Sequence, residues 1–272
     1  MLRPRWAVDR FTMLTAALLL LVTAAAWVGV VRQAGSMEAM NTDGMGMADQ
    51  MPPAGPLIDA PGLVTFVGAW AVMMAAMMLP SALPMILLYR TAARNQAARG
   101  NPLLAIWALV AGYLLVWAAF GAPVYLASRL VDAALASNTA LARLAPYGVA
   151  AVLLIAGLYQ FTPLKQVCLR ACQSPLGFLL RHWRSGRLGA LRMGVEHGAY
   201  CSGCCWALMA VLVVAGAMGL AWVLLIALVV AAEKLLPRGQ WATRATGVGL
   251  LGLGTLVALQ PQLALMLRGQ AP

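Results

Sequence analysis

The fold is decided by stretches such as PLLAIWALVAGYLLVWAAFGAPVYLAS (Pro102–Ser128), 27 residues without one charged side chain. A helix needs about 20 apolar residues to cross the hydrocarbon core of a bilayer. Backbone N–H and C=O groups in lipid must be satisfied internally, so such a stretch is helical unless it belongs to a closed barrel. The short, strictly alternating segments of a barrel are not found in the sequence. The sequence therefore predicts an all-α fold, a polytopic bundle of transmembrane helices.

The rest of the chain repeats this pattern and predicts about seven membrane spans. Only 10% of the 272 residues are charged, against about 25% in a soluble domain. Most of the chain is therefore expected to face the lipid bilayer or other helices. The expected spans are Phe11–Val31, Pro61–Tyr89, Pro102–Ser128, Ala145–Phe161, His197–Gly216, Leu220–Leu236 and Ala245–Met266.

The basic residues predict the orientation of these spans. When the N-terminus is placed in the cytoplasm, 15 of the 19 Lys and Arg residues fall on the inside and 4 on the outside. Such an excess is typical of cytoplasmic loops, so a cytoplasmic N-terminus is predicted. Because the charges lie in short loops between spans, the net charge of +11 does not indicate nucleic-acid binding. The N-terminus reads as Arg3, Arg5 and Arg10, then an apolar run, then Ala24-Ala25-Ala26, so a cleaved signal peptide remains an alternative to an N-terminal anchor.

The cysteines predict a metal site at the cytoplasmic end of the helices. All five lie between residues 168 and 205, in a stretch expected on the cytoplasmic side, where thiols stay reduced. An odd number also leaves one cysteine unpaired in any disulfide framework. Cys168 and Cys172 are four residues apart, which places both thiols on one face of a helix. The fifth span carries a histidine and three cysteines at positions i, i+4, i+7 and i+8, which also share one helix face. A single buried cysteine usually packs as a small apolar residue, but thiols clustered with an imidazole select Cu(I) or Zn(II). The candidate ligands are Cys168, Cys172, His197, Cys201, Cys204 and Cys205.

Carboxylates and thioethers are expected to support this site. An acidic residue bordering a span is costly unless it is paired, and Glu196 or Glu233 is expected to fix the His197 tautomer as a hydrogen-bond acceptor. Ten of the 16 methionines lie in the second span or in the segment before it, which holds Met37, Met40, Met45, Met47 and Met51. Methionine in a membrane helix is ordinarily a packing residue, but its sulfur also suits Cu(I). The candidate auxiliary residues are Glu196, Glu233, Met74, Met77, Met78 and Met209.

Two runs are specific enough to suggest a family, namely MMAAMMLP (Met73–Pro80) and CSGCCW (Cys201–Trp206), together with Cys168, Cys172, His197 and Glu233-Lys234. On these residues the chain resembles the bacterial predicted metal-binding integral membrane proteins, a domain family of unknown function. The resemblance covers about Pro61 to Leu236. It implies metal binding through the named Cys and His residues, and the expected location is the bacterial inner (cytoplasmic) membrane with multiple spans. It implies no reaction and no transported substrate.

The leading hypothesis is that the protein handles Cu(I), by transport or by delivery to a metallochaperone or metalloenzyme partner. Two alternatives remain open: a membrane thiol oxidoreductase or electron-transfer subunit using Cys201-Ser-Gly-Cys204, and a scaffold stapled by Zn(II). The sequence contains no phosphate-binding P-loop and no hydrolase motif, so it indicates neither nucleotide-driven nor hydrolytic chemistry. The hypothesis divides the chain into an N-terminal transmembrane anchor (1–32), a Met-rich extracytoplasmic loop (33–60), a metal-binding membrane core (61–236) and a C-terminal transmembrane helix (237–272).

Overall fold

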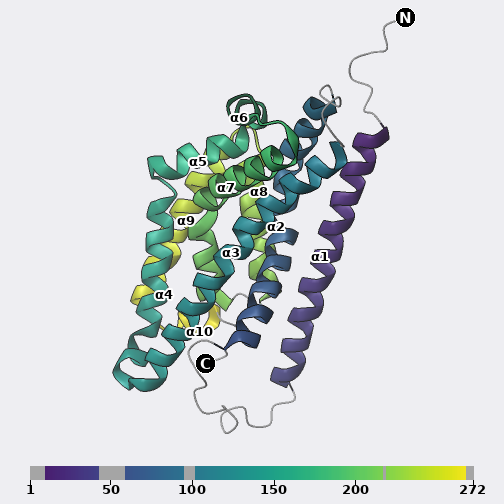
Figure 1. Ribbon diagram of the computed structural model, residues 1–272. Coiled ribbons are helices and arrows are strands. Elements are labelled where there is room, and N and C mark those ends of the chain that lie inside the picture. The colour runs from purple at the N-terminus through teal and green to yellow at the C-terminus, as the bar shows by residue number, and fades with distance from the viewer. Residues whose placement is uncertain (1–9, 43–58, 95–101, 217–218, 268–272) are drawn as a thin grey trace, which may run out of the picture.

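The computed structural model describes residues 10–42, 59–94, 102–216 and 219–267. In these ranges every regular element is a helix, which confirms the all-α fold (Figure 1). The helices are α1 (Arg10–Thr42), α2 (Ala60–Arg94), α3 (Pro102–Ser137), α4 (Thr139–Tyr159), α5 (Pro163–Gln173), α6 (Pro175–His182), α7 (Gly186–Gly216), α8 (Leu220–Leu235), α9 (Gly239–Leu259) and α10 (Leu263–Leu267).

Six of these helices are long and apolar enough to cross a membrane: α1, α2, α3, α4, α7 and α9. Their outward surfaces are apolar: Leu21 on α1 is 65% exposed and Leu115 on α3 is 60% exposed. A multi-pass membrane protein is therefore confirmed. The remaining expected span, Leu220–Leu236, corresponds to α8, whose 16 residues give a length of about 24 Å, somewhat less than the hydrocarbon thickness. The cytoplasmic placement of the N-terminus stays a prediction.

Several helices extend further than the sequence suggested, α7 and α1 the most. Helix α7 begins at Gly186, 11 residues before the expected start at His197, because the intervening residues contain no proline that would interrupt the helix. Helix α1 likewise continues to Thr42, so Met37 and Met40 lie on a helix rather than in the expected loop. The remaining methionines expected in that loop, Met45, Met47 and Met51, lie outside the described residues.

The loop expected between the fourth and fifth spans folds into two short helices. Helix α5 begins where the Thr162 side chain accepts a hydrogen bond from the Lys165 backbone N–H and Pro163 occupies the first turn. The chain enters α7 through Gly186, whose φ of +82° favours glycine. Because α5 is helical, one of its faces is buried and carries Lys165, Cys168, Leu169 and Cys172.

The helices that hold the cysteines meet at one end of the bundle. Figure 1 shows the start of α1 and helices α5 and α6 at the same end, as expected for a chain that has crossed back and forth. Helix α8 returns to this end, where the Gln173 side-chain amide donates to the Glu233 carbonyl over 2.7 Å. The end of α8 is thereby fixed against α5, beside α7.

Candidate metal site

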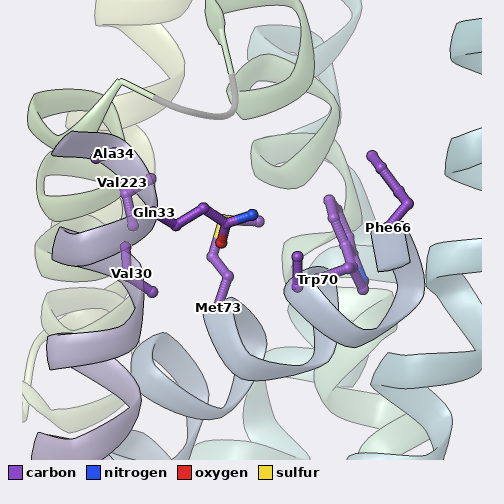
Figure 2. Close-up of a pocket in the computed structure, with 8 residues that line it drawn as sticks. Val30, Gln33, Ala34, Phe66, Trp70, Met73 and Val223 are labelled. Carbon is purple, nitrogen blue, oxygen red and sulfur yellow. The ribbon is translucent and has the colours of Figure 1, made fainter. Parts of the chain in front are cut away.

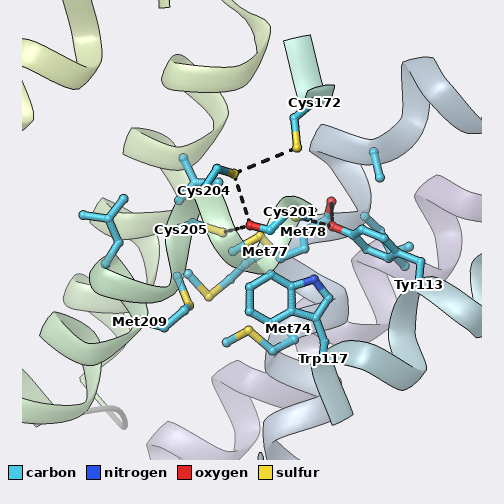
Figure 3. Close-up of a cluster of buried hydrophobic side chains, with 14 of the residues drawn as sticks. Met74, Met77, Met78, Tyr113, Trp117, Cys172, Cys201, Cys204, Cys205 and Met209 are labelled. Carbon is cyan, nitrogen blue, oxygen red and sulfur yellow. Dashed lines mark hydrogen bonds between the residues drawn. The ribbon is translucent and has the colours of Figure 1, made fainter. Parts of the chain in front are cut away.

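The cysteines of α5 and α7 meet in the interior. Cys172 Sγ lies 3.9 Å from Cys204 Sγ, and all five cysteines are buried free thiols (Figure 3). Cys168 also reaches α7, because its sulfur occupies the space beside Gly203, where an added Cβ would lie 2.8 Å from it. The structure thus brings the cysteines of the loop against those of the fifth expected span.

The spacing of Cys172 and Cys204 suits a shared metal ion. With a metal–sulfur bond of about 2.3 Å, sulfurs 3.9 Å apart subtend an angle of roughly 115° at the ion, between tetrahedral and trigonal geometry. Hydrogen bonding with Cys201 and Cys204, together with burial, raises the pKa of the Cys172 thiol well above its ordinary value. Burial and the nearby Cys204 raise the pKa of the Cys168 thiol as well. A metal ion entering this pair therefore has to displace thiol protons.

The Cys201 sulfur is held differently, by a buried ammonium. Lys234 Nζ donates to Cys201 Sγ over 2.9 Å and lies 3.8 Å from Met78 Sδ, while the Tyr113 hydroxyl is 3.0 Å from the same Cys201 sulfur. Lys234 is only 6% exposed, and a buried ammonium has to be paired with an anion. We therefore describe the Lys234–Cys201 contact as an ammonium–thiolate pair. Sequence reasoning missed this role of Lys234, although a lysine at the end of an apolar span is a signal for one.

The carboxylates expected to orient His197 have other partners. Glu233 Oε2 accepts a hydrogen bond from Lys165 Nζ at 2.7 Å, and Glu196 pairs with Arg184 at 3.2 Å. His197 Nδ1 is buried and has no hydrogen-bond partner among the residues that the structure describes. The expectation that Glu196 or Glu233 fixes the His197 tautomer is therefore wrong for this structure, because basic side chains on α5 and next to α7 neutralise both carboxylates.

The His197 ring itself lies among aromatic side chains. It packs 5.7 Å from the Tyr113 ring and 5.0 Å from the Phe178 ring, measured between centroids. Its buried, unpaired Nδ1 atom is consistent with a ligand that lacks its ion. His182, the other histidine, is half-buried and stacks on the Phe178 ring with 4.4 Å between the centroids.

Thioether sulfurs line the interior next to the thiols. Met74, Met77 and Met78 of α2 are at most 3% exposed, and Met209 of α7 is 4% exposed. In Figure 3 these four side chains lie in the same interior region as Cys201, Cys204 and Cys205. The Met193 sulfur of α7 accepts a hydrogen bond from the Arg184 backbone N–H. The auxiliary methionines predicted from the sequence thus gather around the thiols.

The thiols are gathered but not arranged around one ion. Within the described ranges, no group of three or more His, Cys, Asp and Glu side chains has the arrangement of a metal site. The physical reason is that several sulfurs have other bonds: the Cys204 and Cys205 thiols donate to the Cys201 carbonyl over 3.1 and 2.8 Å. The structure has one close sulfur pair, Cys172–Cys204, and beside it the Cys201 sulfur, which is bound to the Lys234 ammonium.

A small apolar cavity of about 30 Å³ lies between α1, α2 and α8. Its wall includes Val30, Trp70 and Met73, and Figure 2 shows the Met73 side chain extending toward Gln33 of α1. Met77 follows Met73 by one helical turn, toward the thiols. The cavity therefore lies beside Met73, the first of the methionines on α2.

Together these features define a class: a multi-pass helical membrane protein whose interior holds clustered thiols and thioethers. The PpoB2 copper chaperone family has a model that matches residues 67–257, which is most of the chain, and the protein belongs to this family. The match runs from α2 to α9 and includes all the cysteines. It supports the metal-related family expected from the sequence and a copper-related function. No curated protein and no solved structure matches the chain.

Proposed function

We propose that the protein holds Cu(I) between α5 and α7 in the bacterial inner membrane and delivers it to a partner metalloprotein. The observation that carries this proposal is the buried Cys172–Cys204 pair, with sulfurs 3.9 Å apart. Membership of a copper chaperone family supports copper as the bound ion and its delivery to a partner protein as the function. On the predicted orientation the sulfur pair is near the cytoplasmic side.

The ligand set favours Cu(I) over Zn(II). A structural zinc site needs four Cys or His ligands in a tetrahedron, and no such group of even three is formed among the described side chains. Cu(I) accepts a smaller set of soft sulfur ligands, so the existing pair suffices for a first complex. Cys201, Cys205, Cys168 and His197 are then candidates for completing the shell after small movements.

The methionines of α2 support a route for the ion. Met73 lies at the cavity beside α1, and Met78 contacts the ammonium that holds Cys201. The two residues are five positions apart, which corresponds to about 7.5 Å of helix, and Met74 and Met77 lie along this interval. Thioethers bind Cu(I) without having to lose a proton, so such a row lets the ion move between sulfurs in an apolar interior.

Cu(I) binding by the purified protein tests this proposal. The protein in detergent is titrated with Cu(I) against a chromogenic Cu(I) chelator, and about one Cu(I) per chain is expected to bind more tightly than the chelator. Cys172→Ser combined with Cys204→Ser is expected to abolish this tight binding. Cys168→Ser removes a third buried thiol from the same helix face, whose sulfur lies against Gly203. Because Cys168 is outside the close sulfur pair, this variant is expected to weaken Cu(I) binding less than the double variant does. X-ray absorption of the loaded protein is expected to show sulfur neighbours of copper.

Other outcomes would favour the alternative functions. Full copper binding by the Cys172/Cys204 double variant would refute the site. Preferential Zn(II) binding, with loss of the fold on chelation, would favour the zinc-stapled scaffold. A reversible disulfide in the metal-free protein would favour the thiol oxidoreductase; the close sulfurs make Cys172–Cys204 the expected pair, rather than Cys201–Cys204.

A further inference from the structure

The Cys201 sulfur, a candidate ligand for Cu(I), is already in contact with another cation, the Lys234 ammonium. Lys234 Nζ lies 2.9 Å from Cys201 Sγ and 3.8 Å from Met78 Sδ, so one thiol and one thioether surround the ammonium. Both sulfurs are of the kind that Cu(I) prefers. An ammonium and Cu(I) also carry the same charge of one unit, so each can neutralise the Cys201 thiolate.

Cys201 is the available counter-ion for the buried Lys234 ammonium. Lys234 and Met78 are buried, as is Tyr113, whose hydroxyl also contacts Cys201. The nearest carboxylate along the chain, Glu233, is already bound by Lys165 through Oε2. An ammonium enclosed in this way is stable only while a negative charge accompanies it, and Cys201 supplies that charge.

We propose that Lys234 is a built-in counter-ion that takes the place of Cu(I) on Cys201 when the site is empty, and so eases release of the ion. This inference rests on the proposed function, because it concerns the same sulfur site. As the Cu–S bond to Cys201 breaks, the thiolate regains its full negative charge in an apolar interior. The returning ammonium stabilises that charge, and without it the departing ion leaves an unpaired buried anion, which is costly.

The structure also contains a place for Lys234 while the ion is bound. Glu233 Oε1 is buried and has no hydrogen-bond partner within the described part of the chain, although Oε2 of the same carboxylate is bound to Lys165. Lys234 is the next residue on α8, and its flexible four-carbon stem allows the ammonium to move while the backbone stays in place. We assign Glu233 Oε1 as the acceptor to which the ammonium shifts when Cu(I) binds Cys201.

The rate of Cu(I) release tests this role. Protein loaded with Cu(I) is mixed with a large excess of Cu(I) chelator, and the transfer is followed by absorbance. Lys234→Leu removes the ammonium without adding a metal ligand and is expected to slow release by about tenfold to hundredfold, the effect of losing a hydrogen bond to a charged group. Lys234→Arg keeps the charge and is expected to restore most of the rate. Tyr113→Phe removes a hydrogen bond from an uncharged donor to the same sulfur. It leaves the Lys234 charge in place and is expected to change the rate less than Lys234→Leu does.

The outcomes separate this inference from the function on which it rests. A wild-type protein that binds no Cu(I) refutes the proposed function itself. A wild-type protein that binds Cu(I) together with a Lys234→Leu variant that releases it as fast refutes only the role of Lys234. If Lys234→Leu does not fold, the structure of the Cu(I)-loaded wild type decides: copper bound to Cys201 with Nζ moved to Glu233 supports the inference, and an unchanged Lys234–Cys201 contact overturns it.

Discussion

The contact between α3 and α7 gives the sharpest test of how the site is held together. The two backbones touch at glycines: a Cβ on Gly194 would lie 2.0 Å from the Leu109 carbonyl oxygen, and a Cβ on Gly112 would lie 2.2 Å from the Leu191 carbonyl oxygen. Small residues allow such close helix packing in membranes. Tyr113, next to Gly112, reaches Cys201 on α7 because of this crossing.

Gly194→Ala is expected to separate the two helices. The added methyl group has to move from 2.0 Å to the 3.4 Å of ordinary contact, and the obstacle is backbone, which cannot rotate away. Overpacking of this kind costs about 1–3 kcal/mol, and somewhat more where backbone has to move. The corresponding fall in apparent melting temperature in detergent is about 3–10 °C. Because the Tyr113–Cys201 contact of 3.0 Å is lost with the crossing, Cu(I) affinity is expected to fall as well.

Gly249→Ala on α9 is the matched control. A Cβ added there meets nothing within 4 Å, and alanine is a better helix former than glycine, so its melting temperature should stay the same or rise slightly. Thermal unfolding followed by intrinsic fluorescence compares the two variants, and chelator competition compares their Cu(I) affinity. Equal melting temperatures for Gly194→Ala and Gly249→Ala would show that α3 and α7 do not cross as closely as the structure indicates.

Three further predictions follow from the buried groups. Glu233→Gln leaves the Lys165 ammonium without its 2.7 Å partner, which should destabilise the protein by about 3–5 kcal/mol in a chemical or thermal unfolding assay; an unchanged stability would mean that the pair is not formed. Met78→Leu, which keeps the volume, should weaken Cu(I) binding in chelator competition, whereas Met85→Leu on the same helix should not; equal effects would argue against a role for the Met78 sulfur. Since the pKa of the Cys172 thiol is raised, the thiol is protonated at neutral pH, and Cu(I) affinity should rise by about tenfold per pH unit for each proton displaced; a flat profile between about pH 6 and 8 would contradict this.

The sequence alone determined the class of fold and the composition of the site. Uncharged stretches such as Pro102–Ser128 predict membrane helices because lipid offers no partner for exposed backbone groups, and six long apolar helices confirm them. The helical spacing of Cys201, Cys204 and Cys205 also placed these residues on one helix, since that pattern depends only on local geometry. Helix ends were less predictable: α7 begins 11 residues before the expected position, because no local signal stops it.

Only the tertiary structure decided which of these residues meet. Cys172 and Cys204 are 32 residues apart in sequence and 3.9 Å apart in space, a contact that depends on how α5 docks against α7. From the sequence, Lys234 is one more basic residue at the end of a span, and Glu233 is an expected partner for His197. In the structure, packing brings Lys234 to Cys201 and Lys165 to Glu233. Spacing along a helix specifies which residues share a face. The partner of a buried charge depends on tertiary packing, because an oppositely charged group has to come close enough to offset the cost of desolvation.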